Sequence, residues 1–270
     1  MTTAHGYGST VTIGPHQRGG HDGGAPPPQP PHGVRLPVNI HHWDNISLLH
    51  WPFASEDIAR LLPRELAVLT YDGMAWLSVT PFFIRVRLPG LPWVPPPCAF
   101  PETNLRTYVA GPDGRQGLWF LRLEVSALWF VAALRAVGLP YVRQRMSVDI
   151  DDERAVYRSR PHRLSSGGGH HIVVSPGDEL RPVHGGPWDR FVTARWGAFH
   201  RRGPLLLYTP VEHGPWHLRA AQVPLCSVDA LFRDAGLPAP VGPPVAHFSP
   251  GVRVKVGVPH LVGRATAGVR

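Results

Sequence analysis

The clearest alternation of polar and apolar residues runs through residues 100–109, Phe-Pro-Glu-Thr-Asn-Leu-Arg-Thr-Tyr-Val. Successive side chains of a β-strand point to opposite faces, so a strand here has two different faces. One face carries Glu102, Asn104, Arg106 and Tyr108, and the other carries threonine, leucine and valine. A face with an acid, an amide, a guanidinium and a phenol is either a solvated edge or the polar wall of a pocket.

The rest of the chain predicts strands joined by tight turns. Strands are expected at residues 66–71 and 74–86, joined by Asp72-Gly73, which is a strong hairpin signal. Pro81 inside the second of these strands requires an edge position or a bulge. Further strands are expected at residues 117–125, 141–150, 155–160, 170–174, 205–211, 216–223 and 252–256.

A few short helices are expected between the hairpins. Ser55 is a good N-cap, the acids that follow suit the positive end of a helix, and Pro63 ends it. The others are expected at residues 127–137, from Pro187 to about Trp196, and between Ser227 and Gly236. The order is mostly β with short helices inserted, which predicts an α+β fold dominated by one closed or partly closed antiparallel β-barrel.

Composition places the barrel in one domain with a tail. The chain has 270 residues, 43% hydrophobic and 17% charged, which supports a sizeable core. Residues 1–37 are rich in glycine, proline and histidine and have no periodic apolar pattern. We expect them to form a disordered tail, because they bury too little apolar surface to offset the entropy of ordering. A single domain is expected over residues 38–265.

Charge and cysteine usage limit the partners. The net charge is +8, but Lys255 is the single lysine and the arginines are spread along the chain, so we expect no nucleic-acid partner. No export signal and no membrane-spanning apolar run are visible. Cys98 and Cys226 are therefore expected to be free thiols, and the predicted location is cytoplasmic with no membrane partner. The sequence does not define an oligomeric state.

The motif search predicts neither a metal nor a cofactor. The chain has 16 histidines, but His213 and His217 are separated by Pro215, which is incompatible with a helix interior. No His-Glu-x-x-His or Cys-x-x-Cys motif occurs. A phosphate-binding loop, a dinucleotide fingerprint and a Gly-x-Ser-x-Gly motif are also absent.

Several separated stretches resemble the YqjF-like family, a branch of the acetoacetate decarboxylase-like superfamily. They occur in the family's order over about residues 38–257. These stretches are Leu49-His50-Trp51-Pro52, Tyr71-Asp72-Gly73-Met74-Ala75-Trp76, Phe100-Pro101-Glu102 with Asn104 and Arg106-Thr107-Tyr108-Val109, and Val211-Glu212-His213-Gly214-Pro215-Trp216. The resemblance implies a cone-shaped antiparallel β-barrel whose interior is the active site.

The resemblance also implies a departure from the decarboxylases. Those enzymes form a Schiff base on a lysine that follows a helix and a turn. The matching positions here are Tyr141 and Val142, which cannot form an imine. Lys255 is placed in the last expected strand, with its charge on the solvent side. We therefore expect the barrel without Schiff-base decarboxylation.

The candidate site follows from the strand and the resemblance together. The decarboxylases also carry a glutamate on a barrel strand, and the resemblance places Glu102 at that position. Glu102 and Tyr141 are the candidate catalytic residues. A buried carboxylate needs a cationic partner, so we expect Glu102 within ion-pair reach of Arg122 or Arg106. The candidate ligand-binding residues are Arg106, Arg122, Tyr108, Asn104 and His213. A buried Glu–Arg network that fixes the barrel accounts for the same residues.

Two functions remain open from the sequence. One is a small-molecule-binding barrel with lysine-independent chemistry on a carbonyl or carboxylate compound. The other is a non-catalytic ligand-binding or structural protein that retains the barrel. Convergence of the candidate residues on one concave pocket favours the first, and dispersal over the surface favours the second.

Overall fold

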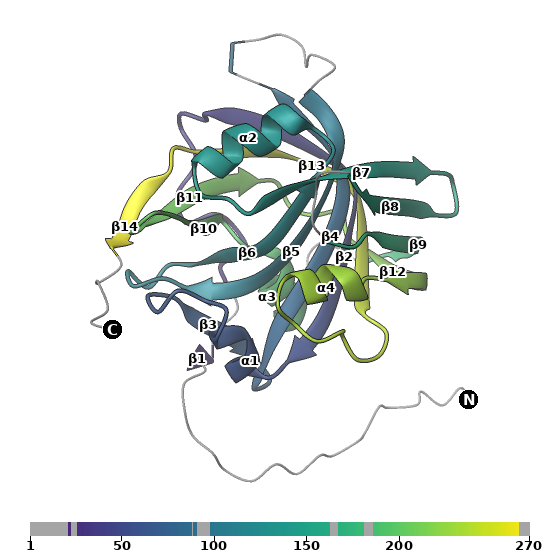
Figure 1. Ribbon diagram of the computed structural model, residues 1–270, viewed down its shortest axis with the longest axis horizontal. Coiled ribbons are helices and arrows are strands. Elements are labelled where there is room, and N and C mark those ends of the chain that lie inside the picture. Colours follow the sequence, from purple (N-terminus) through teal and green to yellow (C-terminus); the bar gives the residue numbers. More distant parts are fainter. Residues whose placement is uncertain are drawn as a thin grey trace.

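The computed structural model describes residues 21–22, 26–87, 89–90, 98–162, 167–180 and 186–264. The fold is mostly β with a few short helices, as predicted (Figure 1). The elements are β1 (His21–Asp22), β2 (Asn39–Phe53), α1 (Ser55–Ala59), β3 (Ala67–Tyr71), β4 (Met74–Arg87), β5 (Ala99–Ala110), β6 (Gln116–Val125), α2 (Leu128–Ala136), β7 (Tyr141–Ile150), β8 (Ala155–Pro161), β9 (His170–Glu179), α3 (Pro187–Thr193), β10 (Gly197–Arg202), β11 (Leu205–His213), β12 (Arg219–Ser227), α4 (Asp229–Asp234), β13 (Val245–Val256) and β14 (His260–Arg264).

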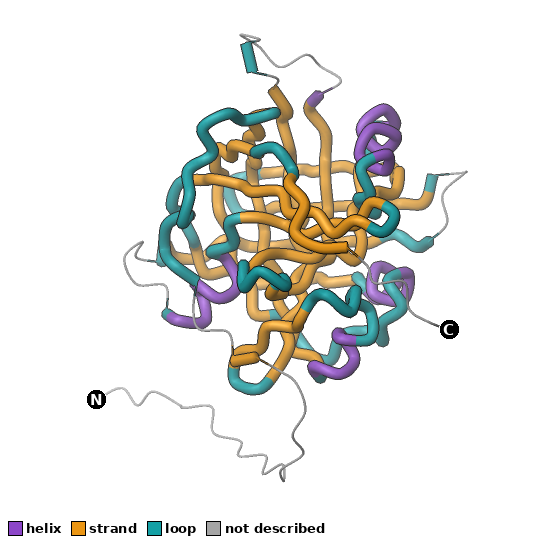
Figure 2. The backbone as a smooth tube through the Cα atoms, turned by 90° about the vertical axis from the view of Figure 1, so that its left-hand side faces the viewer, coloured by secondary structure: helices purple, strands orange, loops and turns teal. Residues whose placement is uncertain are grey.

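The strand pairings close two rings that share five strands. The first ring runs β5–β4–β2–β13–β12–β9–β8–β7–β6 and closes where β6 pairs with β5. The second leaves β6 through β10 and β11 and returns to β13. Strand β6 serves both rings because its first half pairs with β10 and its second half with β7. Figure 2 shows the strands as the body of the molecule, with helices at its periphery.

Several local expectations are confirmed. Asp72 and Gly73 both have positive φ angles in the turn between β3 and β4, as a tight hairpin requires. Pro81 lies in β4 where the pairing with β2 is irregular, between the Asp44–Phe83 and Leu49–Val79 pairs. A proline cannot donate to the ladder, so the predicted bulge is where it can be accommodated. Strands β1, β2, β10 and β14 were not predicted from the sequence.

Strand β5 is buried on both faces. All residues from Glu102 to Val109 are buried. Leu105 belongs to an apolar cluster with Trp51, Tyr157 and Ile172 from β2, β8 and β9, and with Phe232 from α4. The first ring therefore encloses the apolar face of β5, and the polar face must be covered by other elements.

The segment from Pro26 to Pro37, part of the tail expected over residues 1–37, contacts the rest of the domain. Val34 is buried, and its backbone N–H donates to Glu212 Oε2 at 2.6 Å. Trp196 Nε1 donates to the carbonyl oxygen of Pro27 at 3.0 Å. Residues 1–20 and 23–25 of the expected tail lie outside the described residues.

A buried polar network holds the first ring together. Glu124 on β6 accepts from Arg122 Nε at 2.8 Å and from Ser159 Oγ on β8 at 2.8 Å. His170 on β9 lies 3.2 Å from Glu124 and 3.1 Å from Thr103 Oγ1 on β5. Burial alone would raise the pKa of Glu124, but His170 and Arg122 outweigh it and lower the pKa to about 2. The charged carboxylate therefore stabilises the contact between four strands.

No helix among the described residues is both long and apolar enough to cross a membrane.

We predict that the Glu124 network makes the protein sensitive to acid. The pKa of Glu124 is about 2 in the fold against 4.5 ordinarily, so its contribution is fully present above pH 4.5 and is lost as pH falls toward 2. That shift corresponds to about 3 kcal/mol. Glu124→Gln should lower the free energy of unfolding near neutral pH by a similar amount, measured by urea denaturation, and should flatten its pH dependence in this window. Asp57→Asn, in an exposed pair with Arg60, is the control. An equal effect of the two changes would contradict the prediction.

Candidate functional site

The polar face of β5 is a buried surface. Glu102, Asn104, Arg106 and Tyr108 are each less than 10% exposed. Strand β4 runs beside them, so Phe82 pairs with Glu102, Thr80 with Asn104 and Ser78 with Arg106. Helix α3 covers the Tyr108 end, where the Tyr108 hydroxyl donates to the carbonyl oxygen of Val192 at 2.9 Å. The candidate residues of this face therefore do share one environment that is closed to bulk water.

Glu102 and Tyr141 meet at one end of this face. Tyr141 is the first residue of β7 and its hydroxyl donates to Glu102 Oε2 at 3.3 Å. Phe82, Phe100 and Phe130 of the same apolar cluster surround the pair. Burial raises the pKa of Glu102 to about 8, although the hydrogen bond from Tyr141 lowers it. Burial and the neighbouring Glu102 also raise the pKa of Tyr141. At neutral pH the pair therefore consists of an uncharged carboxylic acid and a phenol.

The ion pair expected at Glu102 is not found. Among the described residues, neither Arg106 nor Arg122 pairs with it. Arg122 binds Glu124 and Asp234 instead, with its Nη2 3.2 Å from Asp234 Oδ2. The register explains this, because Arg122 lies opposite Leu105 and paired residues project to the same side of a sheet. Arg122 therefore lies on the other face of β5 and is removed from the expected site.

Arg106 has no carboxylate partner within the described chain. Burial lowers its pKa, and the Tyr108 hydroxyl beside it raises it. Burial is the main cause that lowers the pKa values of His50 and His213, and the charge of Arg106 lowers both further. Arg106 is therefore surrounded by the Tyr108 hydroxyl and by histidines, and no acidic side chain among the described residues neutralises its charge.

Orphaned polar atoms gather around Arg106. Within the described residues, Asn104 Oδ1, Thr80 Oγ1, Arg106 Nε and His50 Nε2 are buried without a hydrogen-bond partner. Thr80 and Asn104 are cross-strand neighbours, and His50, Ser78 and Arg106 form the next row. Because leaving a buried polar atom unpaired costs about 1–3 kcal/mol, such atoms are few in native proteins and each calls for a physical reason. Their concentration in two adjacent rows is typical of a ligand site seen without its ligand.

Tyr108 and His213 flank this cluster. The Tyr108 hydroxyl lies 2.5 Å from Ser78 Oγ, which in turn lies 2.6 Å from His50 Nδ1. His213 Nδ1 lies 2.7 Å from the carbonyl oxygen of Gly214, which makes this nitrogen the protonated one. The His213 ring contacts the rings of Trp196 and Trp216 in tilted arrangements, at centroid distances of 4.6 and 4.9 Å. Both residues are therefore held in fixed orientations beside Arg106.

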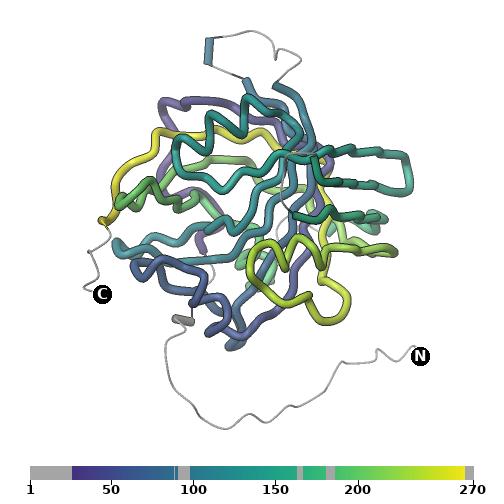
Figure 3. The backbone as a smooth tube through the Cα atoms, viewed as in Figure 1, coloured from purple at the N-terminus to yellow at the C-terminus, as the bar shows by residue number. Residues whose placement is uncertain are grey.

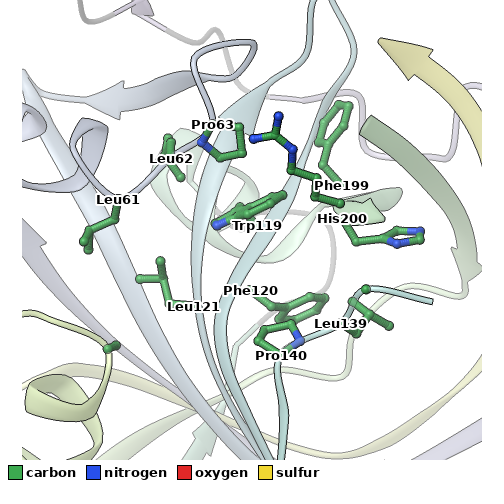
Figure 4. Close-up of a pocket in the computed structure, with 13 residues that line it drawn as sticks. Leu61, Leu62, Pro63, Trp119, Phe120, Leu121, Leu139, Pro140, Phe199 and His200 are labelled. Atoms are coloured by element: carbon green, nitrogen blue, oxygen red, sulfur yellow. The ribbon is translucent and has the colours of Figure 1, made fainter. Parts of the chain in front are cut away.

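The three pockets described at the surface do not contain Glu102, Asn104 or Arg106. The pocket in Figure 4 has a volume of about 480 Å³ and is lined by Leu61, Trp119, Leu121, Pro140 and Phe199, among others. No acidic residue lines it. It contains none of the candidate site residues and carries no functional assignment.

The described residues contain no group of three or more histidine, cysteine, aspartate or glutamate side chains that could hold a metal ion. Cys98 and Cys226 are free thiols, as expected.

Other buried polar residues were missed by the sequence analysis. Glu124 is two residues from Arg122, which was already a candidate, on the same strand, so their shared face could have been found from the pattern. His170 and His247 come from distant strands, and His247 Nε2 lies 3.1 Å from Asp189 Oδ1 of α3. Arg195 follows α3 and contacts the Tyr108 ring at 5.0 Å. Nothing local in the sequence distinguishes these three from surface residues.

Sequence comparison identifies the family. Residues 41–253 match DUF2071, described as an uncharacterized conserved protein. The chain belongs to the DUF2071 family. It is 28% identical over 209 residues to the uncharacterized protein YqjF of Bacillus subtilis (strain 168), which covers 77% of this chain and 85% of YqjF.

Solved structures show the same fold at low identity. An acetoacetate decarboxylase-like enzyme from Sphingomonas wittichii RW1 matches with a TM-score of 0.62 and 13% identity, over 87% of this chain and 96% of its own. The enduracididine biosynthesis enzyme MppR, complexed with pyruvate, matches with a TM-score of 0.59 and 13% identity, over 85% and 92%. Acetoacetate decarboxylase from Legionella pneumophila matches with a TM-score of 0.56 and 10% identity, over 87% and 92%. The acetoacetate decarboxylase-like fold predicted from the sequence is thereby confirmed.

We predict that Glu102 destabilises the fold as pH rises. Its pKa is about 8 in the fold against 4.5 ordinarily, so the unfolded chain loses this proton first and stability falls between pH 4.5 and 8. The shift corresponds to about 5 kcal/mol at most. Glu102→Gln keeps the shape and cannot ionise, so its free energy of unfolding relative to the parent should increase across this window.

Urea denaturation at the two ends of the window measures this difference. Glu65→Gln, at a partly exposed position beside Arg201, is the matched control and should show no such increase. A Glu102→Gln variant whose stability follows that of the parent at both ends would show that Glu102 is ionised in the fold.

Proposed function

We propose that the polar face of β5 binds a small molecule that carries a carboxylate and a carbonyl group. The observation that carries this proposal is the cluster of orphaned buried polar atoms beside Arg106, an arginine without a carboxylate partner among the described residues. A ligand carboxylate would neutralise Arg106 and accept its free Nε–H, and a ligand hydrogen-bond donor would satisfy Asn104 Oδ1. Tyr108 and His213 would fix the geometry of the bound anion.

In this proposal Glu102 and Tyr141 act on the other end of the ligand. Glu102 lies four residues from Arg106, which is about 13 Å along a strand. Both side chains must therefore lean toward Asn104, midway between them, to contact one small ligand. A carboxylic acid with a pKa of about 8 is protonated at neutral pH and can donate to a carbonyl oxygen. Tyr141 is the second donor at this end. Together they would polarise the carbonyl group without any lysine.

Imine chemistry is not part of the proposal. Lys255 on β13 is the single lysine, and its Nζ lies 2.6 Å from Glu212 Oε1 in a partly exposed ion pair. An imine nucleophile must be a primary amine, and no lysine lies on the polar face of β5. Pyruvate is bound in the structure of MppR, which shares the fold, and this supports 2-oxo acids as the first compounds to test. If a ligand binds and is not converted, the chain is a non-catalytic binding protein of the same fold.

A thermal-shift screen against 2-oxo and 3-oxo acids, with the matching alcohols and amides, tests ligand class. An oxo acid at saturating concentration should raise the melting temperature, because binding to the native state alone stabilises it by mass action. The uncharged amides should not, because Arg106 then gains no counter-charge. Glu102 and Arg106 are both buried, so the elements over β5 must move to admit the ligand. We therefore expect slow association.

Arg106→Gln should abolish that response, and Arg145→Gln, at an exposed position on β7, should leave it intact. Because Arg106→Gln removes an unpaired buried charge, it should not lower stability. A parent-like response from the Arg106→Gln variant would refute the proposed site.

We further predict no Schiff base. Borohydride reduction in the presence of acetoacetate should leave Lys255 unmodified, measured by mass spectrometry of peptides, so that any adduct at the α-amino group is distinguished. An adduct mapped to Lys255 would overturn the exclusion of imine chemistry.

A further inference from the structure

A second pocket lies between the segment from Pro26 to Leu36 and the ends of β10 and β11. Its volume is about 650 Å³, within the range of small-molecule sites. Two hydrogen bonds hold the segment over it: Trp196 Nε1 to the carbonyl oxygen of Pro27, and the Val34 N–H to Glu212 Oε2. The pocket is therefore a built feature of the fold, with one wall supplied by residues N-terminal to the ring strands. The backbone of this segment is the purple start of the coloured tube in Figure 3.

The charges that line this pocket all have one sign. Arg35, Arg115 and Arg195 line it together with His32 and His260, and no aspartate or glutamate does. Arg115 is only partly neutralised, because its ion pair with Asp113, at 3.3 Å, lies at the exposed rim. Such a lining attracts an anion and excludes a cation.

Arg195 is the buried member of the set. It is 4% exposed and forms no ion pair within the described residues. Its Nη1 donates to the carbonyl oxygen of Ala194 at 3.1 Å, whereas Nε and Nη2 have no hydrogen-bond partner in the described part of the chain. The guanidinium lies over the rings of Tyr108 and Phe191, at 5.0 and 4.8 Å. These two donors are closed to water beside the pocket lining, so an anion reaches them when the side chains over them shift. A guanidinium with two adjacent unpaired donors matches the geometry of a planar anion.

The other walls are apolar and flat. Trp196 and Tyr208 contribute aromatic rings, and four prolines line the pocket with them. Arg115 lies 5.6 Å from the centroid of the Tyr208 ring, so one side of that ring is already covered by a cation. Flat apolar walls beside a guanidinium fit a ligand with an aromatic body and a carboxylate.

We propose that this pocket is a second ligand site, which takes an aromatic carboxylate. The carboxylate binds Arg195 and Arg115, and the aromatic body packs against Trp196, Tyr208 and the prolines. The site is distinct from the proposed β5 site, because it uses neither Glu102 nor Arg106. The two are neighbours, since Arg195 lines the pocket and also contacts Tyr108 of the polar face.

Calorimetric titration of the full chain with 2-naphthoate tests the proposal. 2-Naphthoate should bind, and 2-naphthalenemethanol, which has the same body without the charge, should bind at least about tenfold more weakly. Arg195→Gln should abolish binding. Because Arg195 is buried and the substitution could disturb folding, the exposed changes Arg115→Glu and Arg35→Glu serve as independent variants, and each should weaken binding several-fold.

Two controls separate binding at this pocket from a general charge effect and from binding at β5. Arg64→Glu makes the same charge change at an exposed position outside the pocket and should leave the affinity for 2-naphthoate within about twofold of the parent value. Glu102→Gln should also leave it unchanged. If Arg64→Glu and Arg115→Glu weaken 2-naphthoate binding equally, the effect is due to the overall charge of the protein and the proposal is overturned. Loss of binding in Glu102→Gln with retention in Arg115→Glu would place the ligand at β5 and overturn it as well.

Discussion

The burial of β5 on both faces is the constraint on which the rest of this structure depends. A strand enclosed on two sides has no solvent for its polar side chains, so each must be paired, neutralised or bound to something else. The two faces meet this requirement differently. On one face Thr103 joins the network of Glu124, His170 and Arg122, and Thr107 donates to the carbonyl oxygen of Trp76. Leu105 and Val109 on the same face pack into apolar clusters. On the other face the requirement is met only in part.

The two faces of β5 therefore differ in role: one stabilises the fold and the other is the candidate binding site. The Glu124 network pairs a carboxylate with cationic and hydroxyl partners from several strands, and it has the character of a stabilising contact. The opposite face combines an uncharged acid at Glu102, an unneutralised cation at Arg106 and, among the described residues, orphaned atoms at Asn104 and Thr80. A protein selected for stability alone would not keep such a face, because apolar residues of similar volume would avoid these costs. The unsatisfied face is therefore the stronger candidate for ligand binding.

The relation to the decarboxylase fold follows the same logic. The chain shares that fold, and Tyr141 and Val142 stand where the resemblance places lysines. Replacing an amine by a phenol beside Glu102 removes a nucleophile and leaves a proton donor. The hydrogen bond from the phenol lowers the pKa of Glu102, but burial outweighs it and raises the pKa to about 8. The proposed chemistry is consequently one of hydrogen bonding and proton donation rather than covalent catalysis.

The sequence by itself determined what depends on neighbouring residues. The period of two fixed which side chains of β5 share a face, Asp72-Gly73 fixed a hairpin, and Pro81 required an irregularity where one is found. Only the tertiary structure decided which side of the sheet each neighbour occupies. Arg122 was assigned to the site and lies opposite Leu105, His170 reaches Glu124 from 46 positions further along the chain, and residues 26–37 contact the domain instead of leaving it. The physical reason is that strand register and ring closure are set by contacts between distant segments, and a shift of one residue moves a side chain to the other face.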